Sequence, residues 1–143
     1  MKYSRSTIVN EQPPDPVGLN EPQLQQLTAH VQRSQLLTPE RLLQTAYAHL
    51  EDLQSARTKC PQIDTALAQS ICRVLDRLVS EWDCFSPTEQ SWLRGVLRYF
   101  TTSDDKCHDF QLGGLRDDVE VLNASLRFVQ REAWILPLDP ESR

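Results

Sequence analysis

The sequence predicts an all-α protein, a single helical bundle of four to five mostly antiparallel helices. Three observations support this class. Apolar residues recur at three- and four-residue steps in several segments, which is the helical period. Only four glycines occur, and the nine prolines lie at the ends of apolar segments or in the N-terminal tail. The length of 143 residues fits one domain that can bury an apolar core without metals or disulfides.

The N-terminal tail and the first helix divide at about residue 20. Residues 1–20 contain Pro13, Pro14 and Pro16 among polar residues and have no amphipathic period, so they are predicted to be a flexible tail. Residues 21–143 are then the helical domain. Its first helix is expected from 22 to about 34, with a thin apolar stripe.

The second and fourth helices have the clearest start signals. Thr38 is a good N-cap before Pro39, and this helix should end near residue 59. Ser86 and Glu89 have the spacing of a capping box, which predicts that the fourth helix begins directly after Ser86.

The third and fifth helices follow from periodicity. Residues 62–81 contain the longest amphipathic pattern in the chain. Residues 116–131 form the last helix, whose apolar residues fall on two faces, so both sides are expected to be covered. The apolar residues after it, up to Leu138, are predicted to fold back onto the bundle.

Charge and cysteine content limit the partners. The net charge is −5 and the pI about 5.1, which argues against nucleic acid and against anionic membrane surfaces as partners. No apolar run is long enough to span a bilayer. Because residues 1–10 contain no apolar signal region, the four cysteines are expected to be free thiols in a reducing cytoplasm.

An acidic turn between the last two helices is the most distinctive feature. Carboxylates are the ligands that hard divalent cations prefer, so five aspartates are candidate metal ligands. They are Asp104, Asp105, Asp109, Asp117 and Asp118. Helix capping and turn formation are the favoured alternative, with Asp117 or Asp118 as a cap, and recognition of a partner is a third.

The same region resembles a known family. Tyr99-Phe100, Asp104-Asp105, Gly113-Gly114 and the run from Asp117 to Asn123 have the order and spacing of the YkvA-like family of domains of unknown function. The resemblance covers about residues 86–129. Family members often carry an apolar loop with a proline where this chain has His108. The resemblance implies a helical hairpin and brings no catalytic residues.

The sequence contains no catalytic signature, and no small-molecule substrate is indicated. It therefore favours a non-enzymatic interaction or adaptor protein whose partner is another protein or a second copy of itself. Candidate partner-binding residues are Arg94, Arg98 and Trp134, for which a solvated helix face and core packing are the alternatives. The second hypothesis is a divalent-metal-dependent hydrolase or a metal-regulated domain that uses the acidic turn. No other cofactor is expected.

Overall fold

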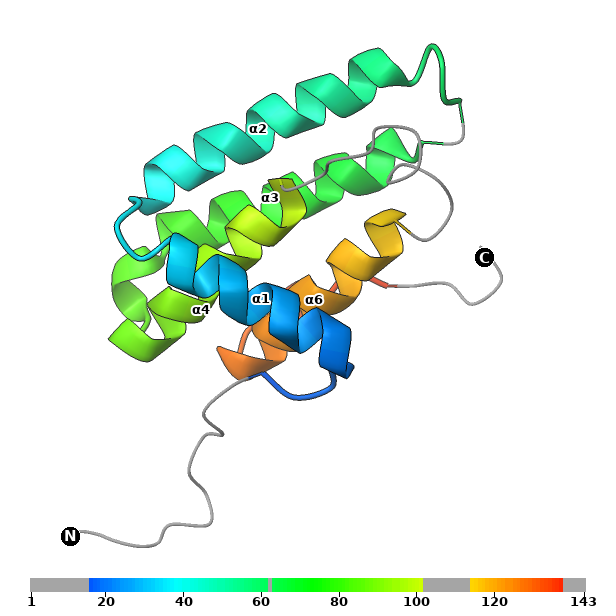
Figure 1. Ribbon diagram of the computed structural model, residues 1–143. Coiled ribbons are helices and arrows are strands. Elements are labelled where there is room, and N and C mark those ends of the chain that lie inside the picture. The colour runs from blue at the N-terminus through cyan, green and yellow to red at the C-terminus, as the bar shows by residue number, and fades with distance from the viewer. Residues whose placement is uncertain (1–15, 62, 102–113, 138–143) are drawn as a thin grey trace, which may run out of the picture.

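The computed structural model of the chain describes residues 16–61, 63–101 and 114–137. These residues form five α-helices and two short 3₁₀ helices, and none of them lies in a strand (Figure 1). The elements are α1 (Glu21–Arg33), α2 (Pro39–Ala56), α3 (Thr65–Ser80), η1 (Trp82–Cys84), α4 (Pro87–Thr101), α6 (Gly114–Phe128) and η2 (Glu132–Trp134). The predicted all-α class is confirmed. Most of the predicted tail and of the acidic turn lies outside the described residues.

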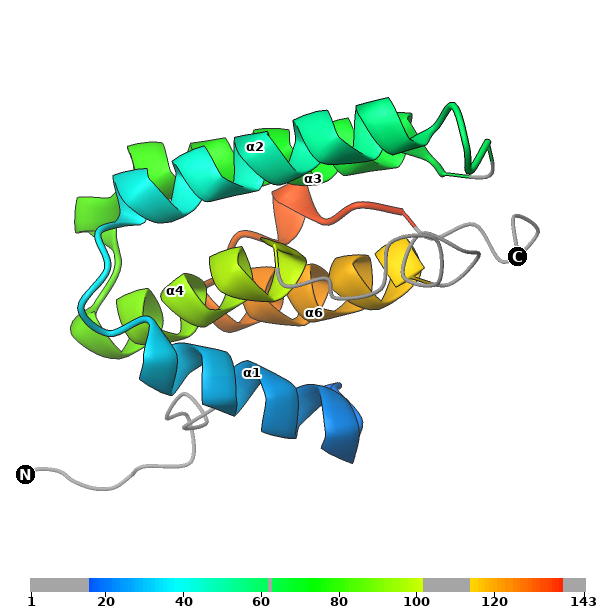
Figure 2. The ribbon, with the colours of Figure 1, turned by 45° about the horizontal axis from the view of Figure 1, so that its top comes forward.

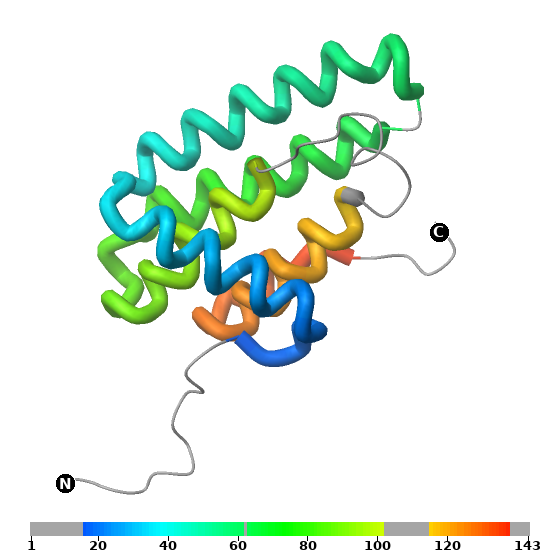
Figure 3. Tube along the Cα trace, viewed as in Figure 1, coloured from blue at the N-terminus to red at the C-terminus, as the bar shows by residue number. Residues whose placement is uncertain are grey.

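The helices form three layers. Helices α2 and α3 run antiparallel in the first layer, α4 and α6 run antiparallel in the second, and α1 covers the outer side of α4 (Figures 1 and 2). The tube in Figure 3 shows the direction of each helix reversing from one to the next. Helix α4 contacts α1, α2 and α6, so it is the centre of the bundle.

Local hydrogen bonds begin the first, second and fourth helices where the sequence predicted. The Thr38 hydroxyl accepts from the Arg41 amide at 3.1 Å. The Ser86 amide donates to the Glu89 carboxylate at 2.8 Å, while the Glu89 amide donates to the Ser86 hydroxyl at 3.2 Å. Asn20 makes the same kind of reciprocal pair with Gln23. These caps satisfy amides that a helix start leaves without partners.

The third and last helices have different bounds from those predicted. Helix α3 begins three residues later, because the Asp64 carboxylate caps it by accepting from the Leu67 amide at 3.0 Å. Helix α6 ends at Phe128, since Gln130 adopts a left-handed φ of 63° and the Arg131 amide donates to the Leu126 carbonyl at 2.7 Å. This pattern is a Schellman motif, which terminates a helix.

The apolar core runs through both layers. Its largest fully buried side chains come from all five helices, including Leu27, Leu53, Leu75, Leu97 and Leu122. The prediction that the last helix is covered on two sides is confirmed, because side chains from both of its apolar faces are buried. The segment after it folds back as predicted. The Asn123 side chain donates to the Leu136 carbonyl at 2.8 Å and accepts from the Leu136 amide at 2.9 Å.

Helices α1 and α4 approach each other closely at Gly95. A Cβ atom on this glycine would lie 2.4 Å from the Val31 Cγ2 atom and 3.1 Å from the Val31 backbone nitrogen. Both distances are shorter than ordinary contacts between non-bonded heavy atoms. The absence of a side chain at Gly95 therefore allows α1 to lie directly against α4.

Candidate functional site

A polar cluster joins α1, α4 and α6 where the three helices meet. Its members are Gln23 on α1, Tyr99 on α4, and Asp117 and Glu120 on α6. Gln23 and Tyr99 are buried, whereas the two carboxylates are half-buried. Asp117 is one of the aspartates of the predicted acidic site.

The two oxygens of Asp117 each accept a hydrogen bond from a different helix. The Tyr99 hydroxyl donates to Oδ2 at 2.5 Å, and the Gln23 amide nitrogen donates to Oδ1 at 2.6 Å. The same Gln23 nitrogen donates to Glu120 Oε1 at 3.0 Å. Hydrogen bonds to an ionised acceptor are stronger than neutral ones, so the cluster ties α1 and α4 to the start of α6.

The surroundings of Tyr99 keep its phenol neutral. Burial raises the pKa of Tyr99 well above its ordinary value, and the hydrogen bond to Asp117 raises it further. The negative charges of Asp118 and Glu120 act in the same direction. Tyr99 therefore serves as a stable hydrogen-bond donor and is unsuited to act as a base near neutral pH.

Helix α6 begins at Gly114, three residues before Asp117. The predicted N-cap role of Asp117 or Asp118 is therefore wrong. Asp117 lies in the first turn, where its charge still opposes the helix dipole. The carboxylate itself faces Tyr99 and Gln23, because neighbouring helices supply donors at that place.

Two of the five predicted metal ligands lie among the described residues. Asp104, Asp105 and Asp109 lie outside the described residues. Asp117 and Asp118 follow each other on α6, and the oxygens of Asp117 are engaged as described above. In the part of the chain that the structure describes, no group of three or more acidic, histidine or cysteine side chains is arranged to hold a metal ion.

The predicted partner-binding residues make contacts within the chain. The Arg94 Nε atom donates to the Leu37 carbonyl at 3.0 Å, and its guanidinium lies 5.4 Å from the centre of the Trp82 ring. Trp134 is half-buried, with the guanidinium of Arg77 4.4 Å and that of Arg131 5.6 Å from its ring centre. These contacts fasten the α1–α2 turn and the C-terminal segment to the bundle.

Arg98 lies on α4 beside the α1 interface. Its side chain is half-buried, and its charge acts on His30 of α1. His30 is itself buried, and its ring meets the Tyr99 ring edge-to-face with centroids 5.8 Å apart. The structure thus places one predicted residue, Arg98, beside a buried histidine that the sequence did not single out.

A shallow hollow lies at the end of the bundle where α2 begins and α3 turns into α4. Its volume is about 440 Å³, and its lining residues are Glu40, Val79, Ser80, Glu81, Trp82, Asp83 and Cys84. Three of these residues carry carboxylates. One of them, Glu81, forms an ion pair with Arg131 at 3.2 Å. The carboxylates of the exposed Glu40 and Asp83 remain at its rim.

The α1–α2 turn lies at the same end of the molecule as the hollow (Figures 1 and 2). Leu36 in this turn is 97% exposed, the most exposed large apolar residue among those described. Arg94 links the turn to the hollow, because it bonds Leu37 and covers Trp82. An exposed apolar side chain and the acidic hollow therefore lie at the same end of the bundle.

The cysteines differ from one another. Cys72 and Cys84 are free, as predicted, whereas the free thiol predicted for Cys60 is wrong because Cys60 forms a disulfide bond. Burial raises the pKa of Cys72 to about 11, so this thiol is not a nucleophile near neutral pH. The cytoplasmic location stays a prediction.

Sequence reasoning missed Gln23, His30 and the hollow. Gln23 occupies the third helical position after an asparagine cap, so the local pattern indicates only a capping box. Its contacts with α6 span 94 and 97 residues of sequence. The hollow joins the start of α2 to the α3–α4 corner, and no sequence spacing indicates that juxtaposition.

Comparisons with known proteins found no match among protein-family models, curated proteins or solved structures. The resemblance of residues 86–129 to the YkvA-like family therefore stays a prediction. Among the described residues, no helix has the length and apolar character needed to cross a membrane.

Proposed function

We propose that this chain is a non-enzymatic interaction module that binds a basic segment of another protein at the acidic hollow beside Leu36. The single observation that carries the proposal is this hollow, which the exposed Glu40 and Asp83 help to line. Carboxylates attract a Lys- or Arg-containing segment across an interface. The Trp82 ring is already covered by Arg94, so the partner's cation is bound by the carboxylates. Leu36 adds an apolar contact at the rim.

The chain's own composition favours a different protein as the partner. A second copy would have to supply a basic segment, and the sequence contains no run of Lys or Arg. The net charge of −5 also makes two copies repel each other at long range. We therefore expect a hetero-complex, and self-association is the outcome that would count against it.

A photo-reactive residue at position 36 tests the proposal. We expect the purified protein to cross-link from this position to Lys- or Arg-rich peptides on an array and not to acidic peptides. The double variant Glu40→Lys/Asp83→Lys should abolish the cross-link, because it reverses the charge at the rim.

The matched control is Glu51→Lys/Asp52→Lys. Both residues are exposed on α2, and the double variant changes the net charge by the same amount. Loss of cross-linking in both double variants would show that binding depends on the net charge of the protein and not on the carboxylates of the hollow. Cross-linking of position 36 only to a second copy of the chain would refute a hetero-complex.

The metal-dependent alternative from the sequence gains no support from the described residues, and it stays a prediction for the acidic turn. A melting temperature raised by millimolar Mg²⁺, Mn²⁺ or Ca²⁺ would favour it, since a ligand bound only by the native state stabilises that state. Loss of that rise in Asp104→Asn/Asp105→Asn would localise the ion.

A further inference from the structure

Helix α1 depends on its neighbours for its structure. It has 13 residues, a length at which an isolated helix is marginal in water. Leu27 is fully buried, Val31 lies against Gly95, and Gln23 donates to the carboxylates of α6. The loss of these contacts would release the helix from α4 and allow it to unfold.

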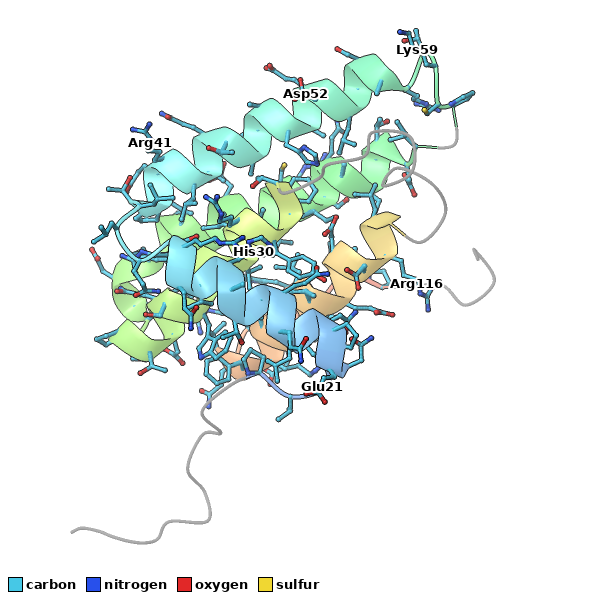
Figure 4. The ribbon with its side chains drawn as sticks, in the orientation of Figure 1. Glu21, His30, Arg41, Asp52, Lys59 and Arg116 are labelled. Atoms are coloured by element: carbon cyan, nitrogen blue, oxygen red, sulfur yellow. The ribbon has the colours of Figure 1, made fainter. Side chains whose placement is uncertain are left out.

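His30 lies within this interface. It is 7% exposed, and its buried Nδ1 atom has no hydrogen-bond partner among the described residues. Its ring plane makes an angle of 84° with that of Tyr99. Figure 4 labels His30 on α1. A buried polar atom without a partner is rare in folded proteins and weakens the structure locally.

Two cations act on the His30 ring. They are Arg98 on α4 and Arg33 on α1. Tyr99 on α4 contacts the ring and is neutral. On α6, the carboxylates of Asp117 and Glu120 accept hydrogen bonds from Tyr99 and Gln23. A proton on His30 would therefore place a positive charge on a buried ring on which the half-buried Arg98 and the exposed Arg33 already act.

We propose that His30 makes α1 an acid-sensitive latch, which lies on α4 while the imidazole is neutral and detaches when it is protonated. Detachment would uncover the face of α4 that carries Gly95 and Tyr99. It would also move the turn that contains Leu36. The latch does not depend on the proposed binding of a basic segment, because it rests on the α1–α4 interface alone.

The direction of the pH dependence follows from linkage. Burial, together with Arg98 and then Arg33, lowers the pKa of His30 below its ordinary value of 6.5. Above that value His30 is neutral in both states, so α1 is fully stabilised. As the pH falls below 6.5, His30 binds a proton more readily in the detached state than in the docked state. The equilibrium constant for docking then falls by at most about tenfold per pH unit.

Hydrogen exchange of the α1 amides tests the latch. After correction for intrinsic exchange rates, we expect protection in α1 to fall several-fold between pH 7.5 and 5.5, while protection in α3 changes less. The variant His30→Phe should remove the difference between the two pH values. The control His49→Phe, in which the altered histidine lies on α2 against Phe100, should retain it.

A fall in protection that persists in His30→Phe would assign the acid response to a group other than His30 and overturn the proposal. If His30→Phe does not fold, the imidazole pKa is measured in the unaltered protein by NMR. A value below 6.5 supports the latch, and a value at or above 6.5 overturns it.

Discussion

At the scale of single residues, the hydrogen bond between Tyr99 and Asp117 can be tested by one substitution. Tyr99→Phe removes the donor and leaves Asp117 with Gln23 as its remaining described donor. We expect a loss of about 1–2 kcal/mol in the free energy of unfolding, because a half-buried carboxylate loses a charge-assisted bond. Urea denaturation of the two proteins measures this loss in the free energy of unfolding.

Tyr47 provides the matched control. Its hydroxyl donates to Asp76 at 2.6 Å on the surface between α2 and α3, and this bond raises the pKa of Tyr47 to about 12. Because Tyr47 is 38% exposed, water can replace its partner after substitution. Equal losses in Tyr47→Phe and Tyr99→Phe would show that burial of the α1–α4–α6 cluster adds nothing.

Gln130 offers a substitution that stabilises the protein. Its φ of 63° lies in the left-handed region, which costs a side-chain-bearing residue free energy and costs glycine almost none. We expect Gln130→Gly to raise the free energy of unfolding by about 0.5–1 kcal/mol, net of the greater freedom of glycine in the unfolded chain. A lower melting temperature in this variant would contradict the left-handed helix end.

At the scale of helices, the packing of α1 on α4 is limited by Gly95. Gly95→Ala places a methyl group 2.4 Å from the Val31 Cγ2 atom. We expect it to destabilise the protein by about 1–3 kcal/mol through overpacking, despite the better helix propensity of alanine. Thermal unfolding measures the change.

Val31→Ala distinguishes overpacking from other causes. It removes the atom that the new methyl group meets, so the double variant Gly95→Ala/Val31→Ala should lose less than the two single losses combined. Simple additivity would show that the close approach is not the reason for the loss.

The C-terminal segment depends on one side chain of α6. Asn123→Ala removes both hydrogen bonds to Leu136. We expect the segment to detach, which would increase quenching of Trp134 fluorescence by acrylamide and cleavage by proteases after Arg131. Asn123→Asp keeps the acceptor and loses the donor, so it should give an intermediate response.

At the scale of the whole molecule, the disulfide at Cys60 links the α2–α3 connection to the rest of the chain. A reducing agent should lower the free energy of unfolding by about 2–4 kcal/mol, because cross-links restrict the unfolded state. Cys60→Ala should show the same loss without a reducing agent, and the exposed Cys84 provides a control in Cys84→Ala. Titration of the unreduced, denatured protein should find fewer thiols than the four cysteines.

Short-range hydrogen bonds explain which expectations from the sequence hold. The class, the number of helices among the described residues and three helix starts were predictable, because capping bonds join residues only three apart. The start of α3 was less predictable. Periodicity continues through residues 62–64, and the Asp64 cap decides where the helix begins.

The candidate site was predictable only in part. Asp117 was singled out as one of several carboxylates, and its predicted role as a cap is wrong. Its partners come from α1 and α4, so their identity depends on how these helices pack. Arg94 looked like a surface cation by spacing alone, whereas in the folded chain it covers Trp82.

The sequence by itself determined the all-α class and the starts of α1, α2 and α4, since apolar periodicity and capping bonds act over three to five positions. The tertiary structure decided which polar groups meet: Gln23 with Asp117, His30 with Tyr99, and Glu40 with the corner after α3. The physical reason is that these contacts require close packing between residues far apart in the chain. Gly95 is an instance, because an ordinary helix position in the sequence becomes the point where α1 meets α4.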